Sequence, residues 1–256
     1  MSLLTLKPTP ASSLPPPNSP DYATYRDQLV QHALALVASL SPTSPGDPLW
    51  HPNKTYNTNK GVPTHTYSST SPPPGSGDCE TYRWHARVSR HGAPSFDDFE
   101  RGLLRNHSVN ERDYIESCYT ARRLAVVHEG ELEASRRAFV FVLLTVSLPA
   151  VPHPTDPTLA PRRSFLVVSL PATHDGAREE DEGEGAVRAR YVSVEHVEED
   201  EEGGVVWTMA VASDAGGAIP RWITERAMPS KVAEDVPSFI EWVTKGKGGE
   251  GVSGSG

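Results

Sequence analysis

Residues 205–243 read VVWTMAVASDAGGAIPRWITERAMPSKVAEDVPSFIEWV. The first eight residues are mostly apolar and β-branched or aromatic, which favours a β-strand. Two glycines then permit a backbone reversal, and a proline follows at a position that suits the first turn of a helix. Beyond it, apolar residues recur at helical spacing, interrupted by Pro229. We therefore predict a strand that leads into one long C-terminal helix, bent or broken near residues 228–230, with Pro237 as the candidate for a second break.

The remainder of the chain divides into a leader, one large domain and a tail. We expect residues 1–20 to form a disordered proline-rich leader and residues 245–256 a disordered glycine-rich tail. Within residues 21–244, periodicity and capping signals predict a helix over 19–40, a strand pair over 49–69, a strand over 79–90, two helices over 95–118, and strands over 119–129, 137–148, 163–170 and 187–197. No helix of useful length fits between the later strands, so we expect an α+β domain whose strands pair antiparallel.

Three local patterns make more specific predictions. Between residues 79 and 90, apolar and polar side chains alternate, which predicts a strand with one face in the core and a polar face. Residues 139–146 are apolar on both faces, so this strand should be covered on both sides. Ser95 with Asp98, and Ser108 with Glu111, have the spacing of a capping box, which predicts two helices in series.

Charge and composition exclude several classes of protein. The net charge of the 256-residue chain is -9, which argues against a general nucleic-acid partner and against lasting adhesion to an anionic bilayer, although brief membrane contact is compatible with it. Two cysteines cannot form a disulfide framework, and the N-terminus is too short and too proline-rich for a signal peptide. We therefore expect a cytoplasmic monomer without a membrane span.

The strongest resemblance lies in residues 205–209, 213–222 and 235–242, with weaker support from residues 84–89 and 191–195. With the order of elements over residues 21–244, these stretches resemble the START-like (helix-grip, Bet v-type) superfamily, and within it a fungal family of uncharacterised proteins. The resemblance implies a curved antiparallel sheet wrapped around the long C-terminal helix, with two short helices after the early strands. It also implies an internal apolar cavity that binds a lipid or another hydrophobic molecule.

Candidate binding residues follow from side-chain type. Aromatic and sulfur-containing side chains on the expected sheet and closing helix suit an apolar site with a few polar tips, although ordinary core packing is the alternative for each of them. Arginines could meet an anionic head group if they face inward, whereas solvated, outward arginine is the more common arrangement. The candidates are Tyr82, Trp84, Phe141, Tyr191, Trp207, Met209, Trp222 and Met228, together with Arg87, Arg188 and Arg190.

No catalytic constellation, phosphate-binding loop or cofactor motif is recognisable, and we read no helical metal-ligand spacing of histidine with an acid. We therefore expect neither a metal nor a cofactor. The leading hypothesis is a module that binds a hydrophobic ligand and either sequesters or transfers it, with the C-terminal helix as its gate. Two alternatives stay open: an enzyme of the polyketide cyclase or aromatase type that uses the same cavity, and a protein-interaction module similar to co-chaperone activators.

Overall fold

The computed structural model describes residues 3–16, 18–40, 49–57, 62–77, 82–115, 121–127, 130–135, 139–156, 158–173, 189–216 and 220–246. Its helical elements are η1 (Ala11–Ser13), α1 (Pro20–Ala38), α2 (Phe96–Phe99), the π-helical turn η2 (Glu100–Leu104), α3 (His107–Tyr114) and α5 (Arg221–Thr244). Its strands are β1 (Thr9–Pro10), β2 (Trp50–Asn57), β3 (Pro63–Ser69), β4 (His85–His91), β5 (Ala121–Val127), β6 (Gly130–Ser135), β7 (Phe139–Ser147), β8 (Ser164–Thr173), β9 (Arg190–Glu199) and β10 (Val205–Asp214).

One ten-stranded sheet forms the centre of the molecule. Its strands follow the order β2-β3-β4-β10-β9-β8-β7-β6-β5, and β1 pairs in parallel with the end of β8. The neighbours along that path pair antiparallel, as expected for strands without crossover helices. β2 is one edge of the sheet. It contains Pro52 and Lys54, and its register with β3 shifts between Pro52 and Thr55.

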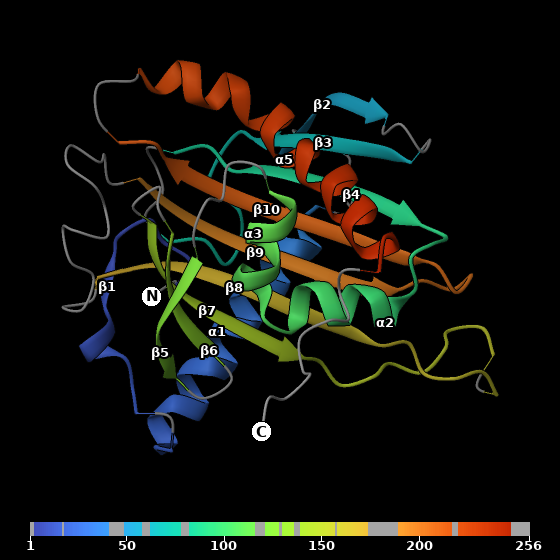
Figure 1. Cartoon of the computed structure of the whole chain (residues 1–256), viewed down its shortest axis with the longest axis horizontal. Helices are drawn as coiled ribbons and strands as arrows, with labels where there is room; N and C mark the ends of the chain where they lie inside the picture. The colour runs from blue at the N-terminus through green and yellow to red at the C-terminus, as the bar shows by residue number, and fades with distance from the viewer. Residues whose placement is uncertain are drawn as a thin grey trace.

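Helices cover both faces of this sheet (Figure 1). On one face, α1 packs Leu29, Ala33 and Leu36 against the sheet. On the other face, α2, η2, α3 and the second half of α5 pack on the sheet, and Phe239 of α5 joins Phe165 and Trp207 of the sheet in one core. The strand predicted to be covered on both sides is confirmed, because β7 contributes Leu143 to one core and Leu144 to the other.

Two helices show how local sequence sets their ends. Ser19 caps α1 by accepting a hydrogen bond from the backbone N–H of Tyr22, and Pro20 occupies the first turn. α5 begins directly after Pro220 and is continuous through Pro229 and Pro237. The C-terminal helix is therefore confirmed, but it is not broken at either proline.

Several predictions about local structure differ from the structure. The leader is not free of the domain: Leu4 and Leu6 are buried against it, and Leu4 O accepts a hydrogen bond from Gly77 N. The Ser95–Asp98 capping box forms, but Ser108 lies inside α3 and Asn106 precedes that helix without a side-chain cap. Strand β6 was not predicted. The candidate Arg188 and residues 247–256 of the tail lie outside the described residues.

Candidate functional site

Charged side chains gather on the sheet face that α5 covers. Arg87 of β4 and Glu195 of β9 both lie opposite Met209 of β10, so the three form one row across neighbouring strands. α3 places His107 and Glu111 over this row. α5 adds Asp235, whose pKa responds to the charges of the row. We call Arg87, His107, Glu111, Glu195 and Asp235 the interior polar cluster.

Glu195 is the centre of this cluster. Its side chain is buried, and its Oε2 accepts a hydrogen bond of 2.8 Å from the indole Nε1 of Trp207. The same oxygen lies 3.6 Å from Nη2 of Arg87, and Oε1 lies 3.7 Å from Nε2 of His107. A buried carboxylate needs such partners, because its charge is costly to remove from water.

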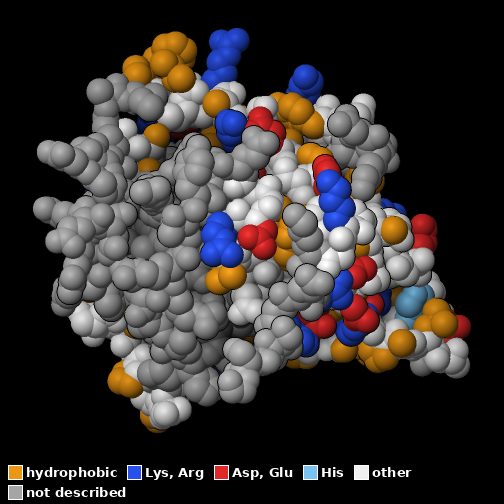
Figure 2. All heavy atoms as spheres, in the orientation of Figure 1, with side chains coloured by type: hydrophobic (Ala, Val, Ile, Leu, Met, Phe, Trp, Pro, Cys, Tyr) orange, Lys and Arg blue, Asp and Glu red, His pale blue; other side chains and the backbone are white. Residues whose placement is uncertain are grey.

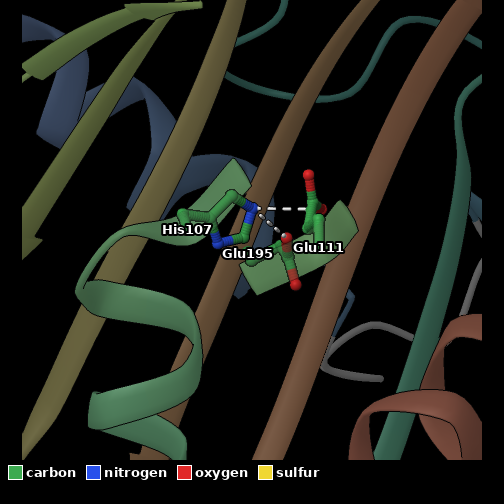
Figure 3. Close-up of side chains that lie close together, drawn as sticks. All are labelled: His107, Glu111 and Glu195. Carbon is green, nitrogen blue, oxygen red and sulfur yellow. Dashed lines mark ion pairs between the residues drawn. The ribbon is translucent and has the colours of Figure 1, made fainter. Parts of the chain in front are cut away.

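His107 is held from both sides of its ring. Nδ1 lies 2.8 Å from the carbonyl oxygen of Leu103, and because that oxygen can only accept, Nδ1 carries a proton. Nε2 lies 3.2 Å from a carboxylate oxygen of Glu111 (Figure 3). Burial alone would lower the pKa of His107, but the charges of Glu111 and Glu195, with hydrogen bonds to Glu111 and Leu103, raise it to about 10. His107 is therefore a cation at neutral pH.

Arg87 is almost fully buried and is incompletely bonded. Its guanidinium carbon lies 3.7 Å from the centroid of the Trp207 ring. Among the described residues, its Nε and Nη1 have no hydrogen-bond partner. Burial lowers the pKa of Arg87, while Glu195 and Asp235 oppose that shift. The interior therefore contains N–H groups that are buried away from water and could donate hydrogen bonds to an oxygen atom of a bound molecule.

Asp235 is the carboxyl group of the cluster whose pKa is raised by its surroundings. Burial raises its pKa to about 7; Arg87 acts in the opposite direction, and the charges of Glu111 and Glu195 add to the rise. Its carboxyl group is therefore shared between protonated and ionised forms near neutral pH. A group with such a pKa can act as either a proton donor or an acceptor.

The sequence candidates divide between this face and the rest of the molecule. Those on the face covered by α5 are Arg87, Phe141, Tyr191, Trp207, Met209 and Met228. Trp84 is buried on the opposite face, in the core beneath α1. The hydroxyl group of Tyr82 donates to Asp214, and Arg190 is exposed at the start of β9. Trp222 is 66% exposed on α5.

Two aspects of this site were missed by the sequence analysis. The polar face of β4 was expected to be typical of a half-buried strand, yet His85, Arg87, Ser89 and His91 are all buried on it. His107 and Glu111 were not recognised as a ligand pair. They are four residues apart on α3, and this i, i+4 spacing was the signal that could have identified them.

Two hollows in the described structure lie beside α1. A surface cleft of about 540 Å³ is bounded by Arg26, Asp27 and Val30 of α1, by Leu104, and by residues 145–149 at the end of β7. A smaller hollow of about 20 Å³ lies between α1 and β7, next to Tyr25 and Leu143. Within the described residues, none of the helices is both long and apolar enough to span a bilayer.

Comparison with known proteins assigns the chain to a family. Residues 84–243 match the family model described as "Protein of unknown function (DUF3074)". This chain belongs to that family. The match includes β4, α3, β9, β10 and nearly all of α5, so it contains all five members of the interior polar cluster. The uncharacterised protein C577.11 of Schizosaccharomyces pombe is 26% identical to this DUF3074 protein in an alignment 240 residues long, which covers 88% of this chain and 87% of that protein.

Solved human structures show the fold of this DUF3074 protein. StAR-related lipid transfer protein 5 aligns with a TM-score of 0.59 at 10% identity, over 87% of this chain and 99% of that chain. The StarD13 (DLC2) lipid transfer and protein localization domain aligns with a TM-score of 0.53 at 17% identity, over 83% and 95% of the two chains. STARD10 aligns with a TM-score of 0.54 at 10% identity, over 92% and 83%. The START-like fold expected from the sequence is confirmed.

Proposed function

We propose that this protein binds a lipid or another hydrophobic molecule between the sheet and the first half of α5, and releases it when that half moves. The observation that carries the proposal is the uneven burial of α5. Its buried residues all lie from Val232 onward, whereas residues 221–231 are exposed or only partly buried. A helix half that is not anchored in a core can move without disrupting it.

The side chains beneath the first half of α5 suit an apolar guest. The hydroxyl group of Ser213 on β10 lies 3.5 Å from the sulfur of Met228, and Ser213 lies opposite Tyr191 on β9. Tyr191 in turn contacts Phe141 at a centroid distance of 5.4 Å. Tyr191, Ser213 and Met228 are all only partly buried. An apolar lining with a few polar tips is the usual composition of a small-molecule site.

The interior polar cluster can bind the polar end of such a ligand. The unbonded Nε and Nη1 of Arg87 can donate to a hydroxyl, carbonyl or carboxylate oxygen at the polar end of the guest. Apolar burial supplies the affinity: about a dozen methylenes gain roughly 10 kcal/mol at ~0.8 kcal/mol each, against an association cost of ~4 kcal/mol or more. The remaining ~6 kcal/mol corresponds to a dissociation constant of tens of micromolar, and this affinity needs no metal and no reaction.

The start of α5 provides a surface for brief membrane contact. Trp222 and Ile223 are 66% and 43% exposed, and hydrophobic side chains gather in Figure 2 where α5 begins. Over the rest of the described surface in this view, cationic and anionic side chains alternate. Tryptophan favours the interface between lipid and water. Contact at the gate would allow a lipid to pass without crossing water.

Native mass spectrometry of the purified full chain, after incubation with a mixed lipid extract, tests this function. We expect a one-to-one complex with an apolar molecule. Ser213→Trp, which fills the proposed region, should reduce the complex at least several-fold, whereas Ser12→Trp, at an exposed position of η1, should not. If the wild-type protein carries no apolar molecule, or if Ser213→Trp carries as much as the control, the proposal is wrong.

A second candidate function is an enzyme of the polyketide cyclase or aromatase type in the same interior. The observation that favours it is Asp235, whose burial raises its pKa to about 7 close to the positive charge of Arg87. Such a pair can move a proton and stabilise an enolate. The test is to incubate the protein with a compound that it binds and then to analyse the recovered compound. The wild type should return it changed in mass or structure, and Asp235→Asn should return it unchanged. Recovery of unchanged compound from both proteins excludes this candidate.

A further inference from the structure

Three potential metal ligands converge in the interior, and binding of an apolar guest requires none of them. Nε2 of His107 and one carboxylate oxygen each from Glu111 and Glu195 all lie within 4.8 Å of one another (Figure 3). The first two side chains come from α3, and the third reaches them from β9. His107 and Glu195 are buried, and Glu111 is only partly exposed. The site is therefore assembled by the fold and is not a chance feature of one helix.

We propose that His107, Glu111 and Glu195 bind a divalent metal ion of the zinc type. Metal–ligand bonds of ~2.0–2.1 Å in a tetrahedral site place neighbouring ligand atoms about 3.3 Å apart. Nε2 of His107 lies 3.2 Å from the Glu111 oxygen and 3.7 Å from the Glu195 oxygen. Both histidine–carboxylate pairs are therefore within a few tenths of an ångström of the spacing that the ion requires, and the two carboxylate oxygens lie within 4.8 Å of each other.

Groups around two of the three ligands, His107 and Glu195, already hold them in position. The Leu103 carbonyl accepts from Nδ1 of His107, which leaves Nε2 as the nitrogen that faces the two carboxylates. Trp207 donates to the Oε2 of Glu195, so Oε1 is the oxygen that faces His107. Hydrogen bonds of this kind to the distal atoms of histidine and carboxylate ligands are a regular feature of protein metal sites.

The choice of metal follows from the ligand set. One imidazole nitrogen and two carboxylates suit zinc, or another first-row divalent ion, better than calcium, which takes six to eight oxygen ligands, or magnesium, which keeps several waters. Three protein ligands on a tetrahedral ion leave one position for water or for an oxygen of another molecule.

A proton competes with the metal ion for Nε2 of His107. Without the metal, the imidazolium pairs with Glu111 and Glu195, and Arg87 supplies the second positive charge of a neutral group of four. A metal ion requires neutral imidazole, so its binding releases that proton. The added charge favours ionisation of the nearby Asp235, which is already about half ionised at pH 7 and so releases up to about half a proton more. Tyr114 is also buried beside these groups, and its pKa is raised by burial and by Glu111 and Glu195. It therefore stays protonated.

Titration calorimetry of the chelator-treated full chain with Zn²⁺ alone, at pH 7 in buffers of different ionisation enthalpy, tests the proposal. We expect one interior site that releases between one and about one and a half protons per ion. With Co²⁺ in place of Zn²⁺, we expect visible absorption typical of low-symmetry four- or five-coordination. Glu111→Gln and His107→Gln should each weaken that site at least ~10-fold. Glu241→Gln, which alters an exposed ion pair on α5 with Lys245, should not.

Unfolding curves of each variant accompany the titrations, because His107 is buried and its loss alters stability. Glu111 is partly exposed, so Glu111→Gln retains the fold and keeps the test decisive if His107→Gln does not fold. Loss of one site in Glu111→Gln but not in Glu241→Gln supports the proposal. Failure of the wild type to bind Zn²⁺, or equal binding by wild type and Glu111→Gln, overturns it. Neither result bears on lipid binding, which native mass spectrometry measures separately.

Discussion

The guanidinium group of Arg87 stacks on the indole ring of Trp207, with 3.7 Å between its central carbon and the ring centroid. The same indole donates a hydrogen bond to Glu195, which is also the ion-pair partner of Arg87. Cation, ring and anion therefore form a closed set in the interior. Each member makes the burial of the next less costly, and removal of one changes the energy of the others.

This closed set predicts non-additive stability. Arg87→Met should lower the free energy of unfolding by about 3 kcal/mol, because Glu195 then loses one of the two cations that pair with it. Glu195→Gln should also destabilise. The double variant should be less destabilised than the sum of the two, by about 1 kcal/mol or more. Urea denaturation of the four proteins measures this coupling, and strict additivity would contradict the arrangement.

Gly102 in η2 lies against two rings of α5. A Cβ added there would lie 2.5 Å from Cε2 of Phe239 and 3.2 Å from Cζ3 of Trp242. Since both rings are buried, Gly102→Ala should destabilise the protein by about 1–3 kcal/mol. Gly92→Ala is the matched control, because an added Cβ there meets no atom within 4 Å. Thermal unfolding of both variants checks the prediction, and equal melting temperatures would refute it.

His91 should make the protein sensitive to acid. Burial, with a smaller contribution from Arg87, lowers the pKa of His91 to about 4, from 6.5 in an unfolded chain. The unfolded state therefore takes up a proton first, and stability is lost as pH falls from about 6.5 to about 4, by at most ~1.4 kcal/mol per pH unit. Burial lowers the pKa of His85 to about 4 as well. His91→Asn should make the loss less steep without removing it, as urea denaturation at pH 7 and pH 5 would show.

The gate hypothesis predicts a role for Trp222 at membranes. Trp222→Ala should reduce binding to phosphatidylcholine vesicles on the order of 10-fold, since an aromatic side chain gains ~1.5–3 kcal/mol on burial. Its unfolding free energy should be unchanged, because the side chain is 66% exposed. Leu159→Ala removes another exposed apolar side chain and serves as the control. Vesicle co-sedimentation measures the binding of both variants. If both lose the same amount of binding, the start of α5 is not the surface that contacts the membrane.

Leu4 tests whether the N-terminal segment belongs to the domain. The side chain is fully buried, so Leu4→Ala should lower the unfolding free energy by about 2–4 kcal/mol. Lys7→Ala, at an exposed position of the same segment, should change it little. Chemical denaturation provides the comparison. A disordered leader would give no difference between the two variants.

Regular periodicity made most of the elements predictable. α1, α5 and nearly all strands follow from apolar spacing and turn residues, because a core selects for one face of a helix or strand. The arrangement around Leu4 could not be predicted, since three leucines in a short segment that is soon followed by prolines show no helical or strand periodicity. β6, with the sequence GELEAS, lacks the apolar alternation by which strands are recognised.

The site was harder to predict than the fold, and β4 shows why. An alternation of apolar and polar residues is the pattern of a half-buried strand, yet in β4 the polar side chains lie inside, opposite α3 and α5. Partners distant in sequence make this burial possible: Glu195 is more than a hundred residues from Arg87. Local pattern contains no information about such partners. For this reason the sequence made Arg87 a candidate only on the condition that its side chain faces the interior.

The outermost strand, β2, bears on how the protein behaves at high concentration. An uncovered strand offers a row of unpaired backbone groups to any other chain. Pro52 has no N–H to offer, Lys54 carries a charge that resists close approach of a copy, and the irregular register beside them disturbs the flat geometry that intermolecular pairing requires. The strand is thereby protected against edge-to-edge aggregation. Exchange of an apolar cargo, as proposed above, would make this protection more important, because opening exposes further apolar surface.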